Sequence, residues 1–519
     1  MMKSVRLAVL AFILAVAASP ALLSAQIVQE RLDMGVLERI QHEGLENSHM
    51  DSLAGHLMDV IGPRLTGSSA IKRGNEWAAA MFEKWGLANI TIEAWDSAFG
   101  RGWEQVSYSG RIVEPFTQQL NATLQAWSGS TQGTVTCPVV MMDVKDTTDF
   151  AKYDGQVRGA CILAGTPQEI GPEFQDRTRR FDADTLLARM GPPSDEPARP
   201  RYTPEQIAEW RAQRALRRAG MRWIRTQGAT AVLFPSGWTY GILRTGGHPD
   251  GRTARDSVYN PIPALLVSHE QFGILHRNAL RGVPTRLELT IENRFLDDRN
   301  SYNVLAEIPG TDLADEVVMV GAHFDSWHSG TGATDNGSGS VAMMEAMRIL
   351  KALDLPMRRT VRIGLWSGEE QGLIGSRTYV RMHEDELDKI SAYFNIDNGT
   401  GRLRGIWNQS NPSVNEIFEQ ILAPLRDLGV LGVRSGNTGG TDHLAFDAVG
   451  VPGFNYIQDP IEYGFRTHHS NADTYERLML DDLRQAATVV AWTVYTVANR
   501  DEMMPRKPAP EPPQAGGGR

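Results

Sequence analysis

The sequence predicts an α/β protein with a mixed, mostly parallel sheet flanked by helices, and two observations support this fold class. From about residue 296 to residue 498, short apolar segments alternate with segments of helical periodicity, which is typical of a parallel or mixed sheet. Several of the apolar segments are followed immediately by residues that can bind metal. That places them at the carboxyl edge of such a sheet, where ligands bind.

The first 25 residues predict a signal peptide rather than part of the fold. Lys3 and Arg6 precede an apolar run from Leu7 to Ala18, and Ser24-Ala25 ends in a small residue. The run is shorter than the roughly 20 residues that span a bilayer. We therefore expect export, to the periplasm or outside the cell, with no stable membrane span after signal removal.

Composition argues against two classes of partner. The 519 residues are 41% hydrophobic and 22% charged, which is ordinary for a globular protein of two or three domains. The net charge of −10 gives no electrostatic basis for binding nucleic acid or an anionic membrane. Cys137 and Cys161 are the two cysteines, and either a disulfide or two buried thiols fits their surroundings.

Residues 26–109 predict the N-terminal part of the main domain, with amphipathic helical periodicity up to Val60 and a second helix from about Ile71 to Trp85. Residues 110–295 predict an inserted α/β domain. Its strand candidates are Thr134–Met142, Ala160–Ala164, Ala229–Phe234, Pro263–Val267 and Thr285–Ile291. Its helix candidate is Glu205 to Thr226, and the polar stretch from Arg177 to Arg201 predicts an exposed excursion.

Residues 296–500 are expected to form the larger part of the main domain. The expected strands are Tyr302–Ile308, Val317–Val320, Val361–Trp366, Ala392–Ile396 and one near Gly453–Ile457. The expected helices are 338–352, 371–382, 413–427 and one from about Leu480 to Val497. Residues 501–519 are rich in Pro and Gly and predict a disordered tail.

Two candidate ligands flank the loop that follows one predicted strand. The run from Val317 to Val320 leads directly to His323, and Asp335 lies just before a helix. Ser338 or Ser340 can cap the start of that helix. The position of His323 at the end of a strand therefore favours a role in binding a ligand.

Three further segments bring similar residues to the same edge. The strand-like TVRIGLW is followed by Glu369 and Glu370, and the strand-like SAYFNI by Asp397. The later segment THHSNADT adds His469 beside an acidic residue. Any one of these is unremarkable, but four such sites aimed at one edge are hard to explain by chance.

The candidate site consists of His323, Asp335, Glu369, Glu370, Asp397 and His469. Neutral imidazoles and carboxylates are ligands suited to Zn²⁺. Two zinc ions close together repel each other, so they need a shared anionic ligand, and a carboxylate can give one oxygen to each ion. Each ion then needs its own histidine and carboxylate, with positions open for a shared water.

Neighbouring acidic residues at this site can divide two tasks. Because the side chains of Glu369 and Glu370 diverge in an extended segment, one can bind metal while the other acts as general base. Asp325, two residues after His323, can orient that imidazole by contacting it without binding the metal itself. Asp473 can do the same for His469, or it can act at a helix N-terminus instead.

The patterns GAHFDSW…TDNGSG, WSGEEQGLIGS, FNIDNG and HHSNADT resemble the co-catalytic di-zinc aminopeptidase family, metallopeptidase family 28. Within this family the resemblance is strongest to the exported carboxypeptidase Q branch. It covers roughly residues 40–100 and 296–498, including the segment GPRLTGS at residues 62–68. It implies a zinc-exopeptidase fold whose inserted domain resembles a protease-associated domain, and homodimers are usual in such enzymes.

The resemblance also implies two Zn²⁺ per chain and a role for each ligand. Asp335 bridges the metals. His323 and Asp397 complete one zinc site. Glu370 and His469 complete the other.

Glu369 is then the general base. The family motif places the histidine ligand directly before Ser or Thr, so His468 is structural or supports the ligands from behind. His443 either hydrogen-bonds the substrate or is structural, and His328 is rejected as a ligand because of its spacing.

The implied reaction is the hydrolysis of terminal peptide bonds in short peptides by a metal-bridged water, with Glu369 as base. A different acyl-transfer enzyme on the same fold, such as glutaminyl cyclase, is one alternative. A non-enzymatic receptor or binding protein is another. Which peptide terminus is attacked and which metal is native stay open, since cobalt or manganese suits the same ligands.

Overall fold

The computed structural model describes residues 29–188, 190, 203–256 and 260–507. The chain divides into two compact units, Met1–Arg31 and Leu32–Arg519, and all described helices and strands belong to the second. The predicted signal peptide lies outside the described residues. None of the helices in the described ranges has the length and apolar character needed to cross a bilayer.

The main sheet has eight strands in the order β1-β10-β12-β11-β13-β16-β14-β15. The bounds are β1 Ala88–Ala94, β10 Tyr302–Ile308, β11 Leu313–His323, β12 Arg359–Trp366, β13 Ile390–Asn395, β14 Leu403–Trp407, β15 Gly432–Arg434 and β16 Gly453–Gln458. The four central strands β12, β11, β13 and β16 run parallel, and β10 and β14 join them antiparallel. This mixed α/β sheet agrees with the predicted fold class.

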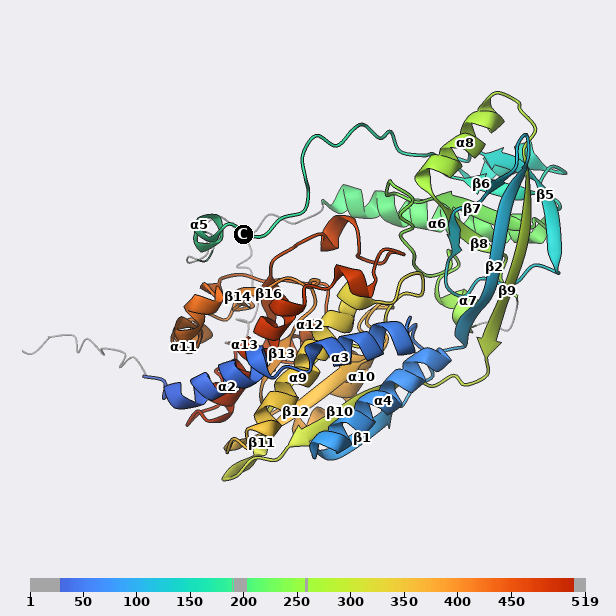
Figure 1. Cartoon of the computed structure of the whole chain (residues 1–519). Coiled ribbons are helices and arrows are strands. Elements are labelled where there is room, and N and C mark those ends of the chain that lie inside the picture. Colours follow the sequence, from blue (N-terminus) through green and yellow to red (C-terminus); the bar gives the residue numbers. More distant parts are fainter. Residues whose placement is uncertain (1–28, 189, 191–202, 257–259, 508–519) are drawn as a thin grey trace, which may run out of the picture. The chain divides into compact units, whose positions relative to one another are not determined.

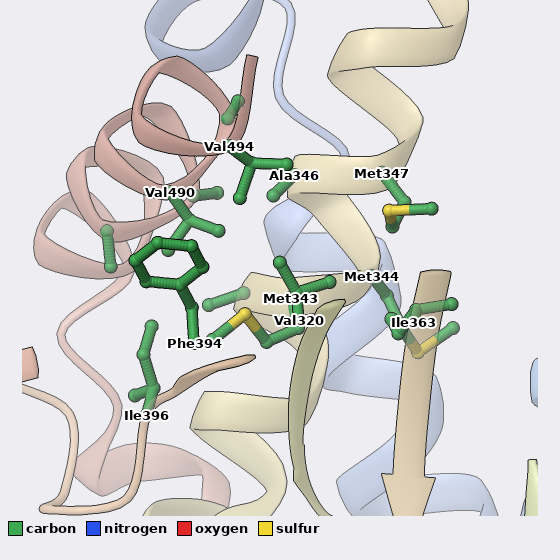
Figure 2. Close-up of a cluster of buried hydrophobic side chains, with 14 of the residues drawn as sticks. Val320, Met343, Met344, Ala346, Met347, Ile363, Phe394, Ile396, Val490 and Val494 are labelled. Atoms are coloured by element: carbon green, nitrogen blue, oxygen red, sulfur yellow. The ribbon is translucent and has the colours of Figure 1, made fainter. Parts of the chain in front are cut away.

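Helices cover both faces of the main sheet (Figure 1). Their bounds are α2 Met34–Glu46, α3 Met50–Gly55, α4 Ser69–Trp85, α9 Ser338–Ala352, α10 Ile374–Met382, α11 Asn415–Leu422, α12 His443–Asp447 and α13 Leu480–Ala498. Successive side chains of a strand alternate between faces, so Val318 and Val320 join the core under α9 and α13, whereas Met319 joins the core with α10 and α12. Figure 2 shows Val320 and Phe394 among the methionines of α9 and the valines of α13.

A second eight-stranded sheet has the order β3-β2-β9-β5-β6-β7-β8-β4. Its strands are β2 Gly102–Glu114, β3 Gln118–Gln119, β4 Ala122–Leu124, β5 Thr134–Met142, β6 Cys161–Ala164, β7 Ala231–Pro235, β8 Ala264–Val267 and β9 Arg286–Leu296. The helices between them are α5 Ala183–Leu187, α6 Pro204–Thr226, α7 Arg252–Asp256 and α8 His269–Leu280. The chain therefore inserts a sheet with its own hydrophobic core between β1 and β10.

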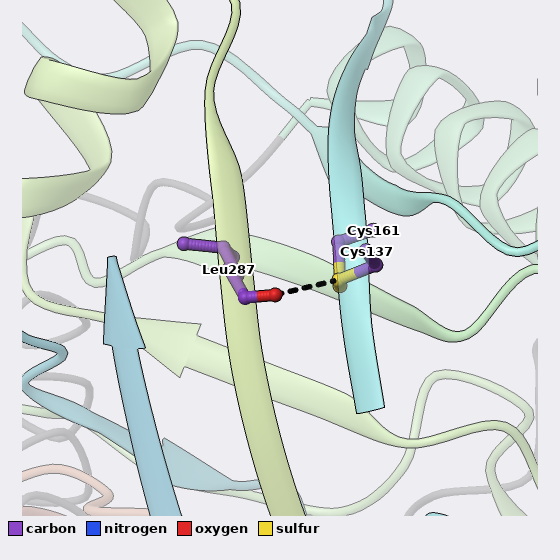
Figure 3. Close-up of a disulfide and its surroundings, with 3 residues drawn as sticks. All are labelled: Cys137, Cys161 and Leu287. Carbon is purple, nitrogen blue, oxygen red and sulfur yellow. Dashed lines mark hydrogen bonds between the residues drawn. A yellow bond between two sulfur atoms is a disulfide. The ribbon is translucent and has the colours of Figure 1, made fainter. Parts of the chain in front are cut away.

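Cys137 on β5 and Cys161 on β6 form a disulfide (Figure 3), which answers the question that the sequence left open. Their Cα atoms are 5.6 Å apart because the two strands are parallel neighbours in the sheet. The sulfur of Cys137 lies 3.7 Å from the carbonyl oxygen of Leu287 on β9. The disulfide thus lies in the centre of the inserted sheet.

Several elements of the structure have no counterpart in the sequence-based prediction. β2 alternates polar and apolar residues along a half-exposed surface, pairs with β9 over its whole length, and has no long apolar run. Helix α8 and strand β14 also went unpredicted. Gly337, rather than Ser338 or Ser340, occupies the N-cap of α9, and the Ser338 hydroxyl donates to the carbonyl oxygens of Thr334 and Gly399.

Two segments, one predicted to be exposed and one predicted to be disordered, make defined contacts. In the predicted exposed excursion, Arg180 forms ion pairs with the buried carboxylates of Asp459 and Asp482. The prediction of a disordered tail is wrong for residues 501–507. Met504 is buried, and Lys507 pairs with Asp447. Residues 191–202 and 508–519 lie outside the described residues.

Candidate active site

Three neighbouring parallel strands bring the predicted ligands to one edge of the main sheet. His323 is the last residue of β11 and pairs in register with Trp366, the last residue of β12. Glu369 and Glu370 follow β12, and Asp397 follows β13, whose Asn395 is in register with Gly321. The carboxyl ends of the strands therefore lie level, as the sequence predicted.

His323 lies at the centre of one cluster of ligand atoms. Its Nε2 is 3.4 Å from Asp335 Oδ1, 3.5 Å from Asp397 Oδ1 and 3.9 Å from Glu369 Oε2. The side chains of His323 and Asp397 are 1% and 8% exposed, so the cluster is nearly closed to solvent. One imidazole and two carboxylates at these distances can share a divalent cation.

A second cluster surrounds His469. Its Nε2 is 2.8 Å from Glu370 Oε2 and 3.4 Å from Asp335 Oδ2. Asp335 therefore directs one carboxylate oxygen to each histidine. His468 is also close, with its Nε2 3.8 Å from the same Asp335 oxygen, so the adjacent histidine that the sequence argument set aside lies within reach of this cluster.

The donor atoms of both clusters fit bound cations. His323 Nε2, Asp335 Oδ2, Glu370 Oε1 and Asp397 Oδ1 are buried and have no hydrogen-bond partner among the described residues. Buried polar atoms are normally paired, and nitrogen and carboxylate oxygen together form a donor set that suits Zn²⁺.

The pKa shifts of the residues in both clusters also indicate that the clusters suit bound cations. Burial lowers the pKa of His323, but the charges of Asp397 and Glu369 outweigh it and raise that pKa well above its ordinary value. Burial also raises the pKa of Glu369 and that of Glu370, the latter further through the charge of Asp335. Closely spaced carboxylates thus create a demand for positive charge, which cations would meet.

The two predicted supporting residues differ in outcome. Asp325 contacts the His323 imidazole as expected: its backbone carbonyl accepts the hydrogen bond of Nδ1 at 3.0 Å, and its carboxylate Oδ1 lies 3.6 Å from the same nitrogen. Asp473 does not support His469. It accepts hydrogen bonds from the backbone N–H groups of Thr334 and Asp335, at 2.6 and 3.2 Å. Burial raises the pKa of Asp473 to about 7.

Arg64 is a site residue whose role the sequence argument missed. Its fully buried guanidinium donates to four carbonyl oxygens, those of Gly62, Phe324, Thr331 and Gly332, each at 2.9 Å. Phe324 follows one ligand directly, and Gly332 precedes the Asp335 segment. Burial lowers the pKa of Arg64 to about 10, so it stays charged at neutral pH and ties both ends of this loop together.

Thr66 connects the supports of two further residues. Its hydroxyl donates to Asp325 Oδ2 at 2.8 Å and accepts from the N–H of Gly368 at 3.0 Å. The other oxygen of Asp325 accepts from the N–H of Glu369 at 3.2 Å. Both Arg64 and Thr66 belong to the segment GPRLTGS, which was the sequence signal that marked them.

The inserted region contacts the loop that carries His469. The N–H of Thr245 donates to the carbonyl oxygen of His469 at 2.7 Å, and Arg244 pairs with Ser470 in an isolated β-bridge. His469 has a positive φ of 58°, a conformation that is uncommon for residues other than Gly. These contacts hold the strained ligand loop in place.

The clusters open into a cleft of about 580 Å³. Leu373 and Arg377 lie on the wall that also carries Glu369, and Tyr463 and His468 also line the cleft. His443 does not line it: the side chain is buried and bonds to the carbonyl oxygen of Thr438.

The rejection of His328 as a ligand agrees with the structure. This histidine packs edge-on against Trp103 and bonds to the carbonyl oxygen of Leu124. Its side chain is therefore occupied outside the two clusters.

Comparison with known proteins shows which protein family this sequence resembles. Residues 303–494 match the family model for Peptidase family M28, and this range contains all six candidate residues. Residues 303–494 are a peptidase family M28 domain. Carboxypeptidase Q of Mus musculus is 29% identical over 454 residues, which cover 87% of this chain and 86% of that protein. Aminopeptidase YwaD of Bacillus subtilis is 29% identical over 223 residues, covering 41% and 49% of the two chains.

Solved structures agree with this assignment. The Peptidase M28 precursor of Shewanella amazonensis superposes with a TM-score of 0.66 at 26% identity, covering 92% of this chain and 99% of that one. A zinc aminopeptidase of Bacillus subtilis shares the fold, with a TM-score of 0.56 at 19% identity over 87% and 95% of the chains. The M28 domain, the peptidase relatives and the ligand clusters together support a metallo-exopeptidase.

Proposed function

We propose that this M28 peptidase is a zinc-dependent enzyme that removes terminal residues from short peptides at a pair of zinc ions. The observation that carries the proposal is the position of Asp335, whose two oxygens face two histidines. His323 has Asp397 as a second carboxylate, and His469 has Glu370. One carboxylate shared between two such sets fits two divalent cations better than one.

The residues then divide the work. His323 and Asp397 would hold one zinc, and Glu370 and His469 the other, with Asp335 shared. When bound, the zinc pair supplies a Lewis acid for the scissile carbonyl and makes a water more acidic. Glu369 accepts the proton of the attacking water at its carboxylate and returns it to the leaving amine.

The position of Glu369 supports its role as the base. Its side chain is 10% exposed and lines the cleft, so it can reach a substrate. Its N–H bonds to Asp325, which is anchored in turn by Thr66. The base is thus fixed relative to His323, because the same Asp325 residue holds both through its carboxylate and its backbone carbonyl.

Glu369→Gln tests this role. We expect the variant to keep about two zinc ions per chain and to lose peptidase activity by roughly 10²- to 10⁴-fold in kcat, the range for losing a general base. Zinc is measured by inductively coupled plasma mass spectrometry and activity with free dipeptides. Glu384→Gln, the same change at a glutamate outside the cleft, serves as the matched control. Normal turnover in Glu369→Gln would remove the base from the mechanism.

Metal analysis of the wild-type chain tests the zinc pair separately. About two zinc ions per chain support the proposal, whereas one supports the single-metal chemistry of the glutaminyl cyclase alternative. Export and a homodimer stay predictions from the sequence.

A further inference from the structure

The cleft contains a cation that the proposed mechanism does not use. Arg377, on α10, is the one lysine or arginine among the described residues that line the cleft. Its guanidinium forms no ion pair with any described carboxylate, and the side chain is exposed. Arg381, one helical turn later, is paired with Asp96. An unpaired, permanently charged group at the edge of a catalytic cleft is available to a ligand.

Backbone hydrogen bonds fix Arg377 relative to Glu369. The N–H groups of Gly372 and Leu373 donate to the carbonyl oxygen of Glu369 at 2.7 and 2.9 Å, and the N–H of Arg377 donates to Leu373 at 3.1 Å. A single short segment therefore carries the proposed base, the apolar wall of Leu373 and the guanidinium. Whatever lies against this wall lies on the base's side of the cleft.

The leaving group of the substrate lies on the same side of the cleft as the proposed base, Glu369. Glu369 returns its proton to the leaving amine, so that amine must come within hydrogen-bond reach of the Glu369 carboxylate. Leu373 and Arg377 line the same cleft as Glu369, so both are near enough to be candidates for contact with the residue that departs with the amine. In a dipeptide, this departing residue carries the free α-carboxylate.

The other charged residues around Arg377 belong to the catalytic centre or to a neighbouring groove. Asp335, Glu369, Glu370 and Asp397 all line the cleft. Beyond Arg377 lies a groove of about 1060 Å³ whose lining carries both signs of charge, from Arg381 and Arg506 as well as Glu384, Asp385 and Asp388. Arg377 lines both spaces. Bound zinc would offset the charges of Asp335, Glu370 and Asp397, so a substrate carboxylate can enter the cleft and pair with Arg377, the one described arginine that lines it.

We propose that Arg377 binds a carboxylate of the leaving residue, and that this contact makes the enzyme select short peptides ending in a free carboxylate. The inference rests on the proposed peptidase function and deepens it by assigning a specificity-determining residue. The carboxylate is either the C-terminal one or that of an acidic side chain.

The experiment compares kcat/KM for matched substrates on wild-type protein, Arg377→Gln and Arg377→Lys. The substrates are Ala-Leu, Ala-Leu-amide, Ala-Glu-amide and Ala-Gln-amide. Arg381→Gln, which removes an equal charge from the same helix outside the cleft, is the matched control. Zinc content is measured for every variant.

We expect the wild-type protein to prefer a carboxylate over its amide. Arg377→Gln should lose about 10- to 100-fold on the carboxylate substrate, as for a lost charge-assisted hydrogen bond, with the amide rate unchanged. Arg377→Lys should keep part of the preference, and Arg381→Gln all of it. Loss confined to Ala-Leu identifies the C-terminal carboxylate, and loss confined to Ala-Glu-amide identifies the side chain.

Two results would overturn the inference while leaving the peptidase function intact. One is a wild-type protein that hydrolyses acids and amides equally well. The other is an Arg377→Gln variant with an unchanged preference. If the wild-type protein binds no zinc and hydrolyses none of the four substrates, the proposed function itself fails.

Discussion

At the scale of single residues, the site depends on side chains that never touch the substrate. Arg64 binds four backbone carbonyls on both sides of the loop between His323 and Asp335. Its charge is matched by carbonyl dipoles and by the nearby charges of Asp473, Asp325 and Asp335. A buried guanidinium with this many bonds leaves the loop little freedom, because breaking any bond leaves an unpaired buried group.

The Thr66 hydroxyl gives the first prediction at this scale. Thr66→Val keeps the shape but leaves Asp325 Oδ2 and the N–H of Gly368 unpaired, at a cost of about 1–3 kcal/mol in stability. We expect kcat to fall about tenfold or more, because the Glu369 segment loses its anchor, while KM changes little. Kinetics and thermal melting measure both effects. Thr66→Ser should restore them, and a Val variant with normal kcat would show that the anchor is dispensable.

At the scale of elements, two arrangements build the site. Because β11 is in register with β12 and β13, the carboxyl ends of these strands, which carry the ligands, lie at the same level. The second arrangement joins the inserted region to the His469 loop, where Asn471 accepts from the N–H of Leu243 at 2.8 Å and donates its own N–H to the Leu243 carbonyl at 3.1 Å. The insert is therefore a structural partner of the metal-binding loop.

Asn471→Ala tests that partnership. Removing the side-chain acceptor leaves the N–H of Leu243 without this partner and loosens one of the contacts between the insert and the His469 loop. The loss of a supporting contact of this kind typically weakens metal binding 10- to 100-fold. We expect the variant to lose about one zinc per chain during dialysis against a mild chelator, under conditions in which the wild-type protein keeps both. Asn471→Asp retains the acceptor for Leu243 and should retain the metal. Equal zinc retention in wild-type and Ala proteins would contradict the prediction.

At the scale of the whole molecule, two sheets with separate cores share one chain. The candidate ligands all come from the main sheet and its loops. The disulfide lies in the other sheet, where it closes a segment with a sequence separation of 24. We therefore expect the substitutions that lower the stability of the insert to differ from those that weaken metal binding.

The double variant Cys137→Ala/Cys161→Ala separates the two. Without the cross-link the unfolded chain gains conformational freedom, so we expect a loss of about 3 kcal/mol in the unfolding free energy of the insert. Thermal melting should show the loss. Zinc content and kcat at 25 °C should stay at wild-type values, and reduced wild-type protein should melt like the variant. An unchanged melting temperature would show that the cross-link adds no stability.

Much of the fold was visible in local patterns. The buried strands β10 to β13 and the helices α9 and α13 carry apolar runs or helical periodicity that report directly on burial. The half-exposed strand β2 was missed, because its stability comes from pairing with β9 far along the chain. Local sequence carries no signal for such a partner.

The sequence by itself determined the α/β class of the main domain and the residue types that gather at one sheet edge. The family resemblance of its motifs already implied that Asp335 is shared between the two histidine sites, and the structure agrees. Only the tertiary structure decided that Asp473 supports the Asp335 loop instead of His469, and that Arg377 is unpaired at the cleft. The physical reason is that these contacts join residues far apart in the sequence. Periodicity and motif spacing record neighbours along the chain, whereas hydrogen bonds such as Asp335 to Asp473 join residues 138 positions apart.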